Sequence, residues 1–381
     1  MTLELPIEKR QKIKNMLSRL LSDRKIKIQN LAESIGVLVA ACPAVAYGWL
    51  YYKELELVKR KALNLFDNNP NKITNLSDSA ISDLKWWDSQ IFVTKNKIRT
   101  STFDLEIFSD ASKSGWGATC GNEKARGLWS KEERMMHINY LEIKAAFLAL
   151  KCFASSLFNK QILLRIDNLT ALAYINKMGG IKHRDLHIMS KRIWEWSKTR
   201  EIWLFAEYIA SKENPADEGS RISNPDTEWE LSDFAFKLLV KKLGNPSIDL
   251  FASRINKKCA RYCSWDRDPD ALAINAFTIS WKNDFWYAFP PFALISRILK
   301  KIREEGSQGI LVVPFWTGQP WFPIFKQLLI SELIEFNPSN NLLLSPCRTL
   351  THPLAADLIL VSGIVSGRLS RKRTWTKTQS K

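Results

Sequence analysis

The chain has 381 residues, 45% of them hydrophobic and 25% charged, which is an ordinary composition for a soluble globular protein of two or three domains. Its formal net charge of +17 favours a polyanionic partner, most simply nucleic acid, although a merely basic surface would give the same balance. The six cysteines are too few and too irregularly spaced for a disulfide framework, so a reducing compartment is expected.

Residues 1–99 are expected to be mostly helical, and they begin without the apolar segment of a signal peptide. The uncharged stretch between Glu33 and Lys53 has about the length of a membrane span. Pro43 and two glycines interrupt it, which favours two packed helices over a span. A polar loop then leads to a helix with two plausible N-caps, Ser77 and Asp78.

Residues 100–225 predict a mixture of strands and helices. Three antiparallel strands joined by glycine-containing turns are expected in FDLEIFSD, GWGATC and ARGLW. An amphipathic helix in NYLEIKAAFLALKCFASSL and a buried strand in QILLRID follow. Two more helices, in NLTALAYINKM and HRDLHIMSKRIWEWSKTR, precede a fifth strand in IWLFAEYI. The predicted fold class is therefore α/β.

Four acidic residues stand at the ends of these elements: Asp110, Glu142, Asp167 and Asp217. Two of them end strands, Glu142 is placed in the first turn of a helix, and Asp217 lies where the last loop enters a helix. Four acids at one edge of a sheet would repel one another unless divalent cations joined them, and Mg²⁺ prefers carboxylate oxygens. Two such ions, roughly 4 Å apart, can activate water and stabilise the leaving oxygen in phosphodiester cleavage.

Each acid also has a purely structural interpretation. These interpretations are a cap of the turn after Asp110, a capping box from Asn139 to Glu142, a helix cap by Asp167, and an ion pair between Asp217 and Arg221. The pairs CARYC and HRDLH have metal-like spacing, but neither has a second pair to complete a tetrahedral zinc site. The two histidines are expected on a helix surface.

The segments FSDASKSGWGA, NYLEIKAAFLAL, RIDNLTALAYINKMGG and ENPADEGSR together resemble a type 1 ribonuclease H domain, specifically that of DIRS-type retroelement reverse transcriptases. The resemblance implies a ribonuclease H-like mixed five-stranded sheet flanked by helices. It also implies that Asp110, Glu142, Asp167 and Asp217 are catalytic acids that bind two Mg²⁺ or Mn²⁺ ions. Many family members carry a histidine before the last acid, whereas ASKENPAD has none, so slower turnover is expected.

The implied substrate is an RNA/DNA hybrid, recognised by shape and 2′-hydroxyls through basic side chains. The basic helix around 184–200 suits that role, although it could equally be a solvated face over a tryptophan-containing core. Three further contacts are expected beside the catalytic acids. The predicted nucleic-acid contacts are Ser112, Lys113, Asn168, Arg184, Lys191 and Arg192.

The flanking segments extend the resemblance to the same retroelements. Residues 1–99 resemble the thumb and connection that precede ribonuclease H, and the chain contains no Tyr-x-Asp-Asp motif, so no polymerase palm is expected. IDLFASRINKKCARYCSW and WYAFPPFALISRILKKI resemble a Dam-like adenine methyltransferase module. Phe289 stands where that family has an acidic or amide residue, and no clear glycine-rich loop is present. A retained fold that binds or braces nucleic acid is therefore expected rather than a methyltransferase activity.

Five segments follow from these patterns: a helical region at 1–99, a ribonuclease H-like domain at 100–225, a linker at 226–244, a second α/β domain at 245–365 and a basic tail at 366–381. The predicted activity is metal-dependent cleavage of RNA in RNA/DNA hybrids. The alternatives are a catalytically silent nucleic-acid-binding relic or a DNA adenine methyltransferase. Other segments of a retroelement polyprotein are candidate partners. An intracellular location, cytoplasmic or nuclear, is expected, with SRKR a weak nuclear signal and no membrane contact.

Overall fold

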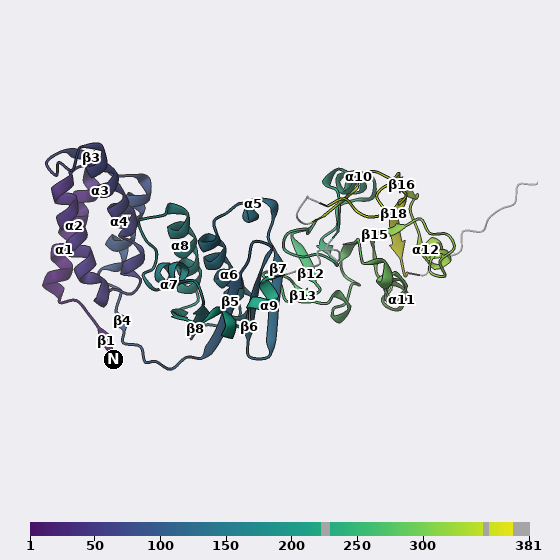
Figure 1. Ribbon diagram of the computed structural model, residues 1–381, viewed down its shortest axis with the longest axis horizontal. Helices are drawn as coiled ribbons and strands as arrows, with labels where there is room; N and C mark the ends of the chain where they lie inside the picture. Colours follow the sequence, from purple (N-terminus) through teal and green to yellow (C-terminus); the bar gives the residue numbers. More distant parts are fainter. Residues whose placement is uncertain (222–228, 346–349, 369–381) are drawn as a thin grey trace, which may run out of the picture. The chain divides into compact units, whose positions relative to one another are not determined.

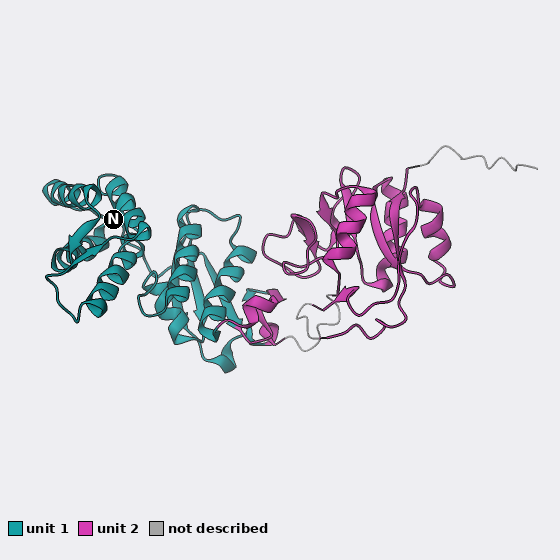
Figure 2. Ribbon diagram, turned by 90° about the horizontal axis from the view of Figure 1, so that it is seen from above, with its two compact units in different colours: residues 1–110, 119–122, 137–217 teal, residues 111–118, 123–136, 218–381 magenta. Residues whose placement is uncertain are grey.

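The computed structural model describes residues 1–221, 229–345 and 350–368 (Figure 1). The predicted basic tail from residue 369 onward, with its SRKR motif, lies outside the described residues, as do residues 226–228 of the predicted linker. The chain forms two compact units (Figure 2). Unit 1 comprises Met1–Asp110, Thr119–Asn122 and His137–Asp217, and unit 2 comprises Ala111–Ala118, Glu123–Met136 and Glu218–Lys381.

Four helices dominate the N-terminal part of unit 1, in agreement with the predicted helical character. They are α1 (Ile7–Ser22), α2 (Ile28–Ala41), α3 (Lys53–Leu65) and α4 (Asp78–Gln90). Helix α1 packs on α4, and α2 packs on α3. Apolar residues at helical spacing are buried in this part, such as Ile13 and Leu17 in α1. Two short antiparallel pairs complete this part: β1 (Thr2–Leu3) with β4 (Asn96–Lys97), and β2 (Lys25–Lys27) with β3 (Ile73–Asn75).

The uncharged stretch before Lys53 differs in detail from the two helices expected there. Helix α2 ends at Ala41, and Pro43 lies in a 3₁₀ turn, because a proline ring cannot continue an α-helix. A second 3₁₀ turn, Gly48–Leu50, replaces the second helix. Within the residues described, no helix combines the length and apolarity needed to cross a bilayer. Of the two plausible N-caps, Ser77 caps α4, with its hydroxyl accepting a hydrogen bond from an amide at 3.2 Å.

The middle of the chain forms a mixed five-stranded sheet, as predicted. Its strands are β5 (Leu105–Ala111), β6 (Gly115–Cys120), β7 (Glu123–Leu128), β8 (Gln161–Ile166) and β9 (Trp203–Tyr208). Their order is β7-β6-β5-β8-β9, and β8 is parallel to both β5 and β9. Parallel neighbours end at the same edge of a sheet, so residues that follow β5 and β8 come close together.

Three helices lie against this sheet where the sequence predicted them: α6 (Ile138–Phe153), α7 (Leu169–Asn176) and α8 (Arg184–Lys198). Two short helices were not predicted from periodicity, α5 (Lys131–Arg134) and α9 (Asp217–Ser220). Helices α6, α7 and α8 pack against one another, and each contacts β8 or β9 (Figure 1). The predicted apolar face of α6 is buried, with Leu141 and Ala145 fully inaccessible.

A second sheet of seven strands lies in unit 2. Its strands are β11 (Ile248–Asp249), β12 (Arg261–Ser264), β13 (Ala273–Ile274), β14 (Phe285–Ala288), β15 (Gln308–Pro314), β16 (Ile334–Phe336) and β18 (Leu360–Ser366). The order is β13-β12-β11-β14-β15-β18-β16. The pairs from β13 to β15 are parallel, whereas β18 is antiparallel to both neighbours. From β11 the chain adds β12 and β13 on one side and then adds β14 on the other side of β11. The position between β11 and β14 is therefore a topological switch point.

Both faces of this sheet are covered, which explains its nearly continuous apolar strands. On β15, Leu311 and Val313 belong to one buried cluster together with residues of α11 (Ile295–Glu305) and α12 (Phe322–Leu328). Ile310 and Val312 belong to a second cluster together with residues of α10 (Asp233–Leu243).

The predicted linker at 226–244 is wrong for its described part. Residues Glu230–Leu231 form β10, which pairs with β17 (Leu343–Leu344), and α10 follows directly. Ala235 and Leu239 of α10 are buried against the sheet. Apolar residues at helical spacing in SDFAFKLLVKKL account for this helix, which Ser232 caps.

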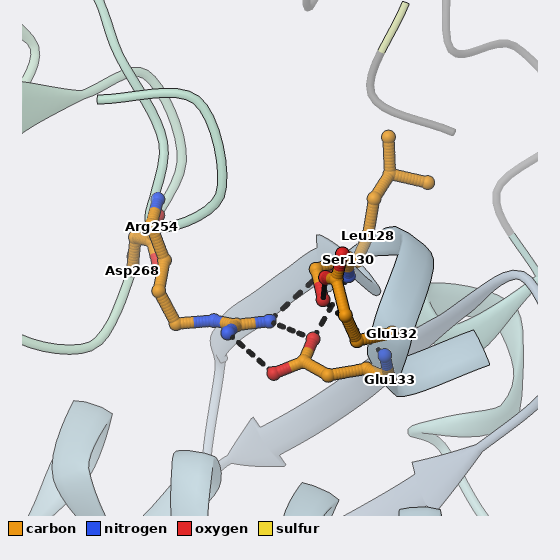
Figure 3. Close-up of polar contacts among 6 residues, drawn as sticks. All are labelled: Leu128, Ser130, Glu132, Glu133, Arg254 and Asp268. Atoms are coloured by element: carbon orange, nitrogen blue, oxygen red, sulfur yellow. Dashed lines mark hydrogen bonds and ion pairs between the residues drawn. The ribbon is translucent and has the colours of Figure 1, made fainter. Parts of the chain in front are cut away.

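An ion pair joins the turn at α5 to the loop after β11 within unit 2 (Figure 3). The Arg254 guanidinium donates to both carboxylate oxygens of Glu133, at 2.8 and 2.9 Å, and to the carbonyl of Leu128 at 3.2 Å. Both side chains are largely buried, with exposed fractions of 20% for Arg254 and 12% for Glu133. A second pair nearby in sequence, Arg126 with Asp266 at 3.1 Å, is exposed.

Candidate metal centre

Three carboxylates from three separate elements converge in unit 1. Asp110 lies near the end of β5, Glu142 lies on α6, and Asp167 follows β8 directly. One ligand oxygen from each lies within 4.8 Å of the other two. Asp110 and Glu142 are each only 4% exposed. The parallel pairing of β5 with β8 explains why the two aspartates meet, because both strands end at the same edge.

Neighbouring residues fill three of the four structural roles that were expected as alternatives for these acids. Ser112 caps the turn after β5, since its hydroxyl accepts hydrogen bonds from two amides of that turn. His137 caps α6 by accepting from the amide of Asn139 at 3.1 Å. Asn168 caps α7. The start of α6 at Ile138 also places Glu142 in the second turn rather than the predicted first turn.

The loop after β9 reaches back to this cluster through two residues that sequence reasoning missed. The Ser211 hydroxyl donates to Asp167 Oδ2. Asn214 is buried, and its side-chain amide donates to the carbonyl of Ser109 in β5 at 3.1 Å. These two bonds fix the loop beside Asp110 and Asp167. The polar run SKEN was the sequence signal, but nothing in it indicated which residue would turn inward.

Asp217 begins α9, as predicted, at the end of the loop that Asn214 anchors. Among the residues described, the group with ligand oxygens within 4.8 Å has three members, and Asp217 is not one of them. The structure therefore gathers three of the four predicted acids into one group.

The donor set fits a hard divalent cation. Mg²⁺ binds oxygen ligands at about 2.1 Å, so two oxygens on opposite sides of one ion lie about 4.2 Å apart. The observed mutual distances, up to 4.8 Å, are of that size. The group contains only carboxylates, which suits Mg²⁺ or Mn²⁺ better than zinc, a metal usually held by thiolates and imidazoles.

The pairs with metal-like spacing have other surroundings. Burial raises the pKa of Cys259 to about 12 and that of Cys263 to about 11, and neither thiol belongs to a group of potential metal ligands among the described residues. His187 is fully buried rather than on a helix surface, and its Nε2 lies 3.5 Å from Glu54 Oε1.

Two predicted nucleic-acid contacts, Lys113 and Asn168, make local bonds. Lys113 is exposed and donates to the carbonyl of Met136 at 2.7 Å. The side-chain amide of Asn168 donates to Asn139 Oδ1 at 3.0 Å in addition to its capping bond. Ser112 also donates to a backbone carbonyl at 2.7 Å, which ties it to α9.

The basic helix α8 divides its predicted contacts between solvent and protein. Arg184 and Arg192 are exposed. Lys191 instead donates to Asp83 of α4 at 2.8 Å. Burial raises the pKa of Asp83 to about 6, and the charge of Lys191 opposes that rise. Trp194 is buried, as the alternative of a tryptophan-containing core predicted.

A carboxylate also lies at the switch point of the second sheet, where α/β proteins commonly bind ligands. Asp249 ends β11 and is buried, and its oxygens accept hydrogen bonds from the amides of Phe251 at 3.3 Å and Lys258 at 3.0 Å. Burial raises its pKa to about 6. Phe289, which follows β14, packs its ring against Phe292. The Asp249 carboxylate is therefore bound by backbone amides of the loop that follows β11.

Comparisons with known proteins give solved structures but no family. No protein-family model matches the chain, and no curated protein gives a significant match. Ribonuclease H1 from the archaeon Halobacterium salinarum is 20% identical over 30% of this chain and 92% of its own, with a TM-score of 0.26. LC11-RNase H1 in complex with an RNA/DNA hybrid is 18% identical over 30% of this chain and 93% of its own, also at 0.26.

A foamy viral protease-reverse transcriptase in complex with double-stranded DNA is 16% identical, over 54% of this chain and 35% of its own, with a TM-score of 0.22. TM-scores below 0.5 at such identities do not establish an activity for this chain. The functional argument therefore rests on the carboxylate group and its surroundings.

Proposed function

We propose that this chain is a metal-dependent endonuclease that cleaves the RNA strand of RNA/DNA hybrids. The observation that carries the proposal is the convergence of Asp110, Glu142 and Asp167 from β5, α6 and the end of β8. Buried carboxylates this close together are costly unless a cation joins them. The net charge of +17 supports a polyanionic substrate.

In this mechanism the three carboxylates hold the cation, and the residues around them fix their geometry. A bound Mg²⁺ or Mn²⁺ supplies a Lewis acid for the phosphate and lowers the pKa of a water. Ser211 orients Asp167 by donating to Oδ2, and Asn214 holds the loop on β5. Asp217, at the end of that loop, is proposed as a fourth acid that would complete a site for a second ion.

The proposed substrate contacts are the predicted ones, weighted by their surroundings. Arg184 and Arg192 are exposed and available to phosphates. Lys191 would first have to leave Asp83, so it is the weakest of the three. Ser112, Lys113 and Asn168 are proposed as contacts next to the acids in the sequence.

We further propose that the chain derives from a DIRS-type retroelement polyprotein whose other segments are its partners, and that it acts inside the cell, in the cytoplasm or nucleus. The quoted ribonuclease H-like segments support that origin.

The test is cleavage of an end-labelled RNA/DNA hybrid with Mg²⁺ or Mn²⁺, beside an Asp110→Asn variant. We expect cuts within the RNA strand by the unchanged chain and none by the variant, with equal melting temperatures. Folded protein that binds the hybrid but leaves it intact would contradict the proposal and favour a silent binding module.

The order of the second sheet favours a second candidate function in unit 2. A doubly wound sheet with a switch point between β11 and β14 is typical of domains that bind a nucleotide-like cofactor there. S-adenosylmethionine is the cofactor that the Dam-like resemblance implies. Against methyl transfer stands Phe289, whose side chain cannot accept a hydrogen bond from an amine. Calorimetric titration with S-adenosylmethionine tests this candidate, and no saturable heat would remove it.

A further inference from the structure

A pocket of about 420 Å³ lies in unit 1, apart from the carboxylate group. Its walls come from α3, from β3 with the start of α4, and from the loop that precedes α8. None of the three clustered acids lines it. The pocket is therefore separate from the proposed metal centre, and it shares only Arg184 with the proposed substrate contacts.

Positive charge dominates the lining of this pocket. Four cationic side chains contribute to it, against one acidic side chain. The cations are Arg60, Lys61, Lys182 and Arg184, and all four are exposed. The acid, Glu54, is buried, and His187 lies 3.5 Å from its carboxylate. A polyanion approaching from solvent would meet the four cations before Glu54.

The loop that forms one wall is held in place before any ligand arrives. Arg60 Nη1 donates to the carbonyl of Ile181 at 3.0 Å, which joins α3 to this loop. The amide of His183 donates to the Tyr174 hydroxyl at 3.0 Å on the other side. A preformed site loses less conformational entropy on binding.

The remaining lining combines apolar and neutral polar groups. Leu57, Val58 and Ala62 present an apolar wall on α3, while Thr74 and Ser77 supply hydroxyls. A cationic rim over such a wall matches one unit of a nucleic-acid backbone, where phosphates meet Lys and Arg and the sugar meets apolar and hydroxyl groups.

We propose that this pocket binds the sugar–phosphate backbone of a nucleic-acid strand and so anchors the substrate at a second point. The inference rests on the proposed function for the identity of the substrate. A polynucleotide fits better than a free nucleotide, because all four cations are exposed to solvent and the whole chain carries +17.

The test is a Lys61→Gln/Lys182→Gln double variant, compared with a Lys9→Gln/Lys12→Gln control. The control removes two exposed lysines of α1 that do not line the pocket. Arg60 is left intact because it holds the loop. Binding of a labelled RNA/DNA hybrid is followed by fluorescence anisotropy in EDTA at several salt concentrations, so that no cleavage is required.

We expect the pocket variant to bind roughly tenfold more weakly at low salt and to lose about two units of salt slope, one per phosphate contact. The control should stay within about twofold of the unchanged chain. An unaltered affinity and slope in the pocket variant would overturn the proposal. So would saturable, lysine-dependent binding of adenosine monophosphate with unchanged hybrid affinity, which would make the pocket a mononucleotide site.

Failure of this inference and failure of the proposed function give different results. If the unchanged chain cuts no hybrid but binds it through the two lysines, the nuclease proposal fails and the pocket proposal stands. If it cuts hybrid and the double variant binds normally, the reverse holds.

Discussion

Both sheets of this protein carry an aspartate where a parallel strand ends, yet the two surroundings are opposite. At the five-stranded sheet, one carboxylate oxygen each of Asp110, Glu142 and Asp167 lies within 4.8 Å of the other two. In the seven-stranded sheet, Asp249 belongs to no such group of three acids among the described residues, and the backbone amides of its own loop bind both of its oxygens. Position in the fold is shared, whereas the partners differ.

The difference shows what decides the role of a buried carboxylate. Asp249 accepts bonds from amides, so its negative charge already has donors and the loop gains a fixed shape. Asp110 lies close to two other acids, so an added cation would lower the free energy of this group. A strand-end aspartate therefore indicates a metal site only when other acids converge on it.

The largest expected effect concerns Glu142. Glu142→Gln keeps the size of the side chain but removes one of the three charges, and we expect hybrid cleavage to fall by about 10³-fold or more. The measurement is the initial rate in Mg²⁺, with circular dichroism to confirm folding. Normal cleavage by a folded variant would contradict a catalytic role for the acid group of the five-stranded sheet.

Glu133, whose carboxylate is paired with Arg254, should affect stability instead. Arg254→Ala leaves Glu133 buried without its guanidinium, so we expect unit 2 to lose about 3–5 kcal/mol of unfolding free energy. Urea denaturation measures this loss. The matched control is Arg126→Ala, whose pair with Asp266 is about half exposed and should contribute less than about 1 kcal/mol. Equal losses in both variants would contradict the importance of burial.

Asp249 should affect the pH dependence of the free energy of unfolding rather than the cleavage activity. Its pKa in the folded state, about 6, lies above the ordinary 3.8, so between these values the folded state holds a proton that the unfolded state has released. The free energy of unfolding therefore falls as pH rises from about 4 to about 6, by at most about 3 kcal/mol. Asp249→Asn should reduce that slope in urea titrations by the share that Asp249 contributes. An unchanged slope would assign it elsewhere, for instance to Asp83, whose pKa is also raised to about 6.

The smallest of these effects concerns Asp217, which lies outside the group of three. Asp217→Asn should slow cleavage by roughly 10–100-fold, less than Glu142→Gln, because the three clustered carboxylates would still be present to hold a cation. Single-turnover rates of the two variants give the comparison directly. A loss for Asp217→Asn as large as that for Glu142→Gln would place Asp217 fully within the metal site.

Local patterns predicted much of the first sheet. Alternation and glycine turns located β5, β6 and β7, and helical spacing located α6 and α8. The sequence also singled out the three acids that converge. These features are local, or, for the acids, follow from strand ends meeting at one edge.

Features that depend on distant contacts were not predictable in the same way. Lys191 looked like a phosphate contact, and its partner Asp83 is 108 residues away in the sequence. The inward turn of Asn214 depends on a carbonyl 105 residues earlier. In the second sheet, β11 is two residues long, so periodicity over so few positions could not define its pairing.

The most direct test of the central claim compares Asp110→Asn and Asp249→Asn in one hybrid-cleavage experiment with Mg²⁺ and Mn²⁺. We predict that the unchanged chain and Asp249→Asn cut the RNA strand at similar rates, whereas folded Asp110→Asn does not cut it. Cleavage that survives Asp110→Asn, or is lost equally in both variants, would contradict a metal site built on the five-stranded sheet.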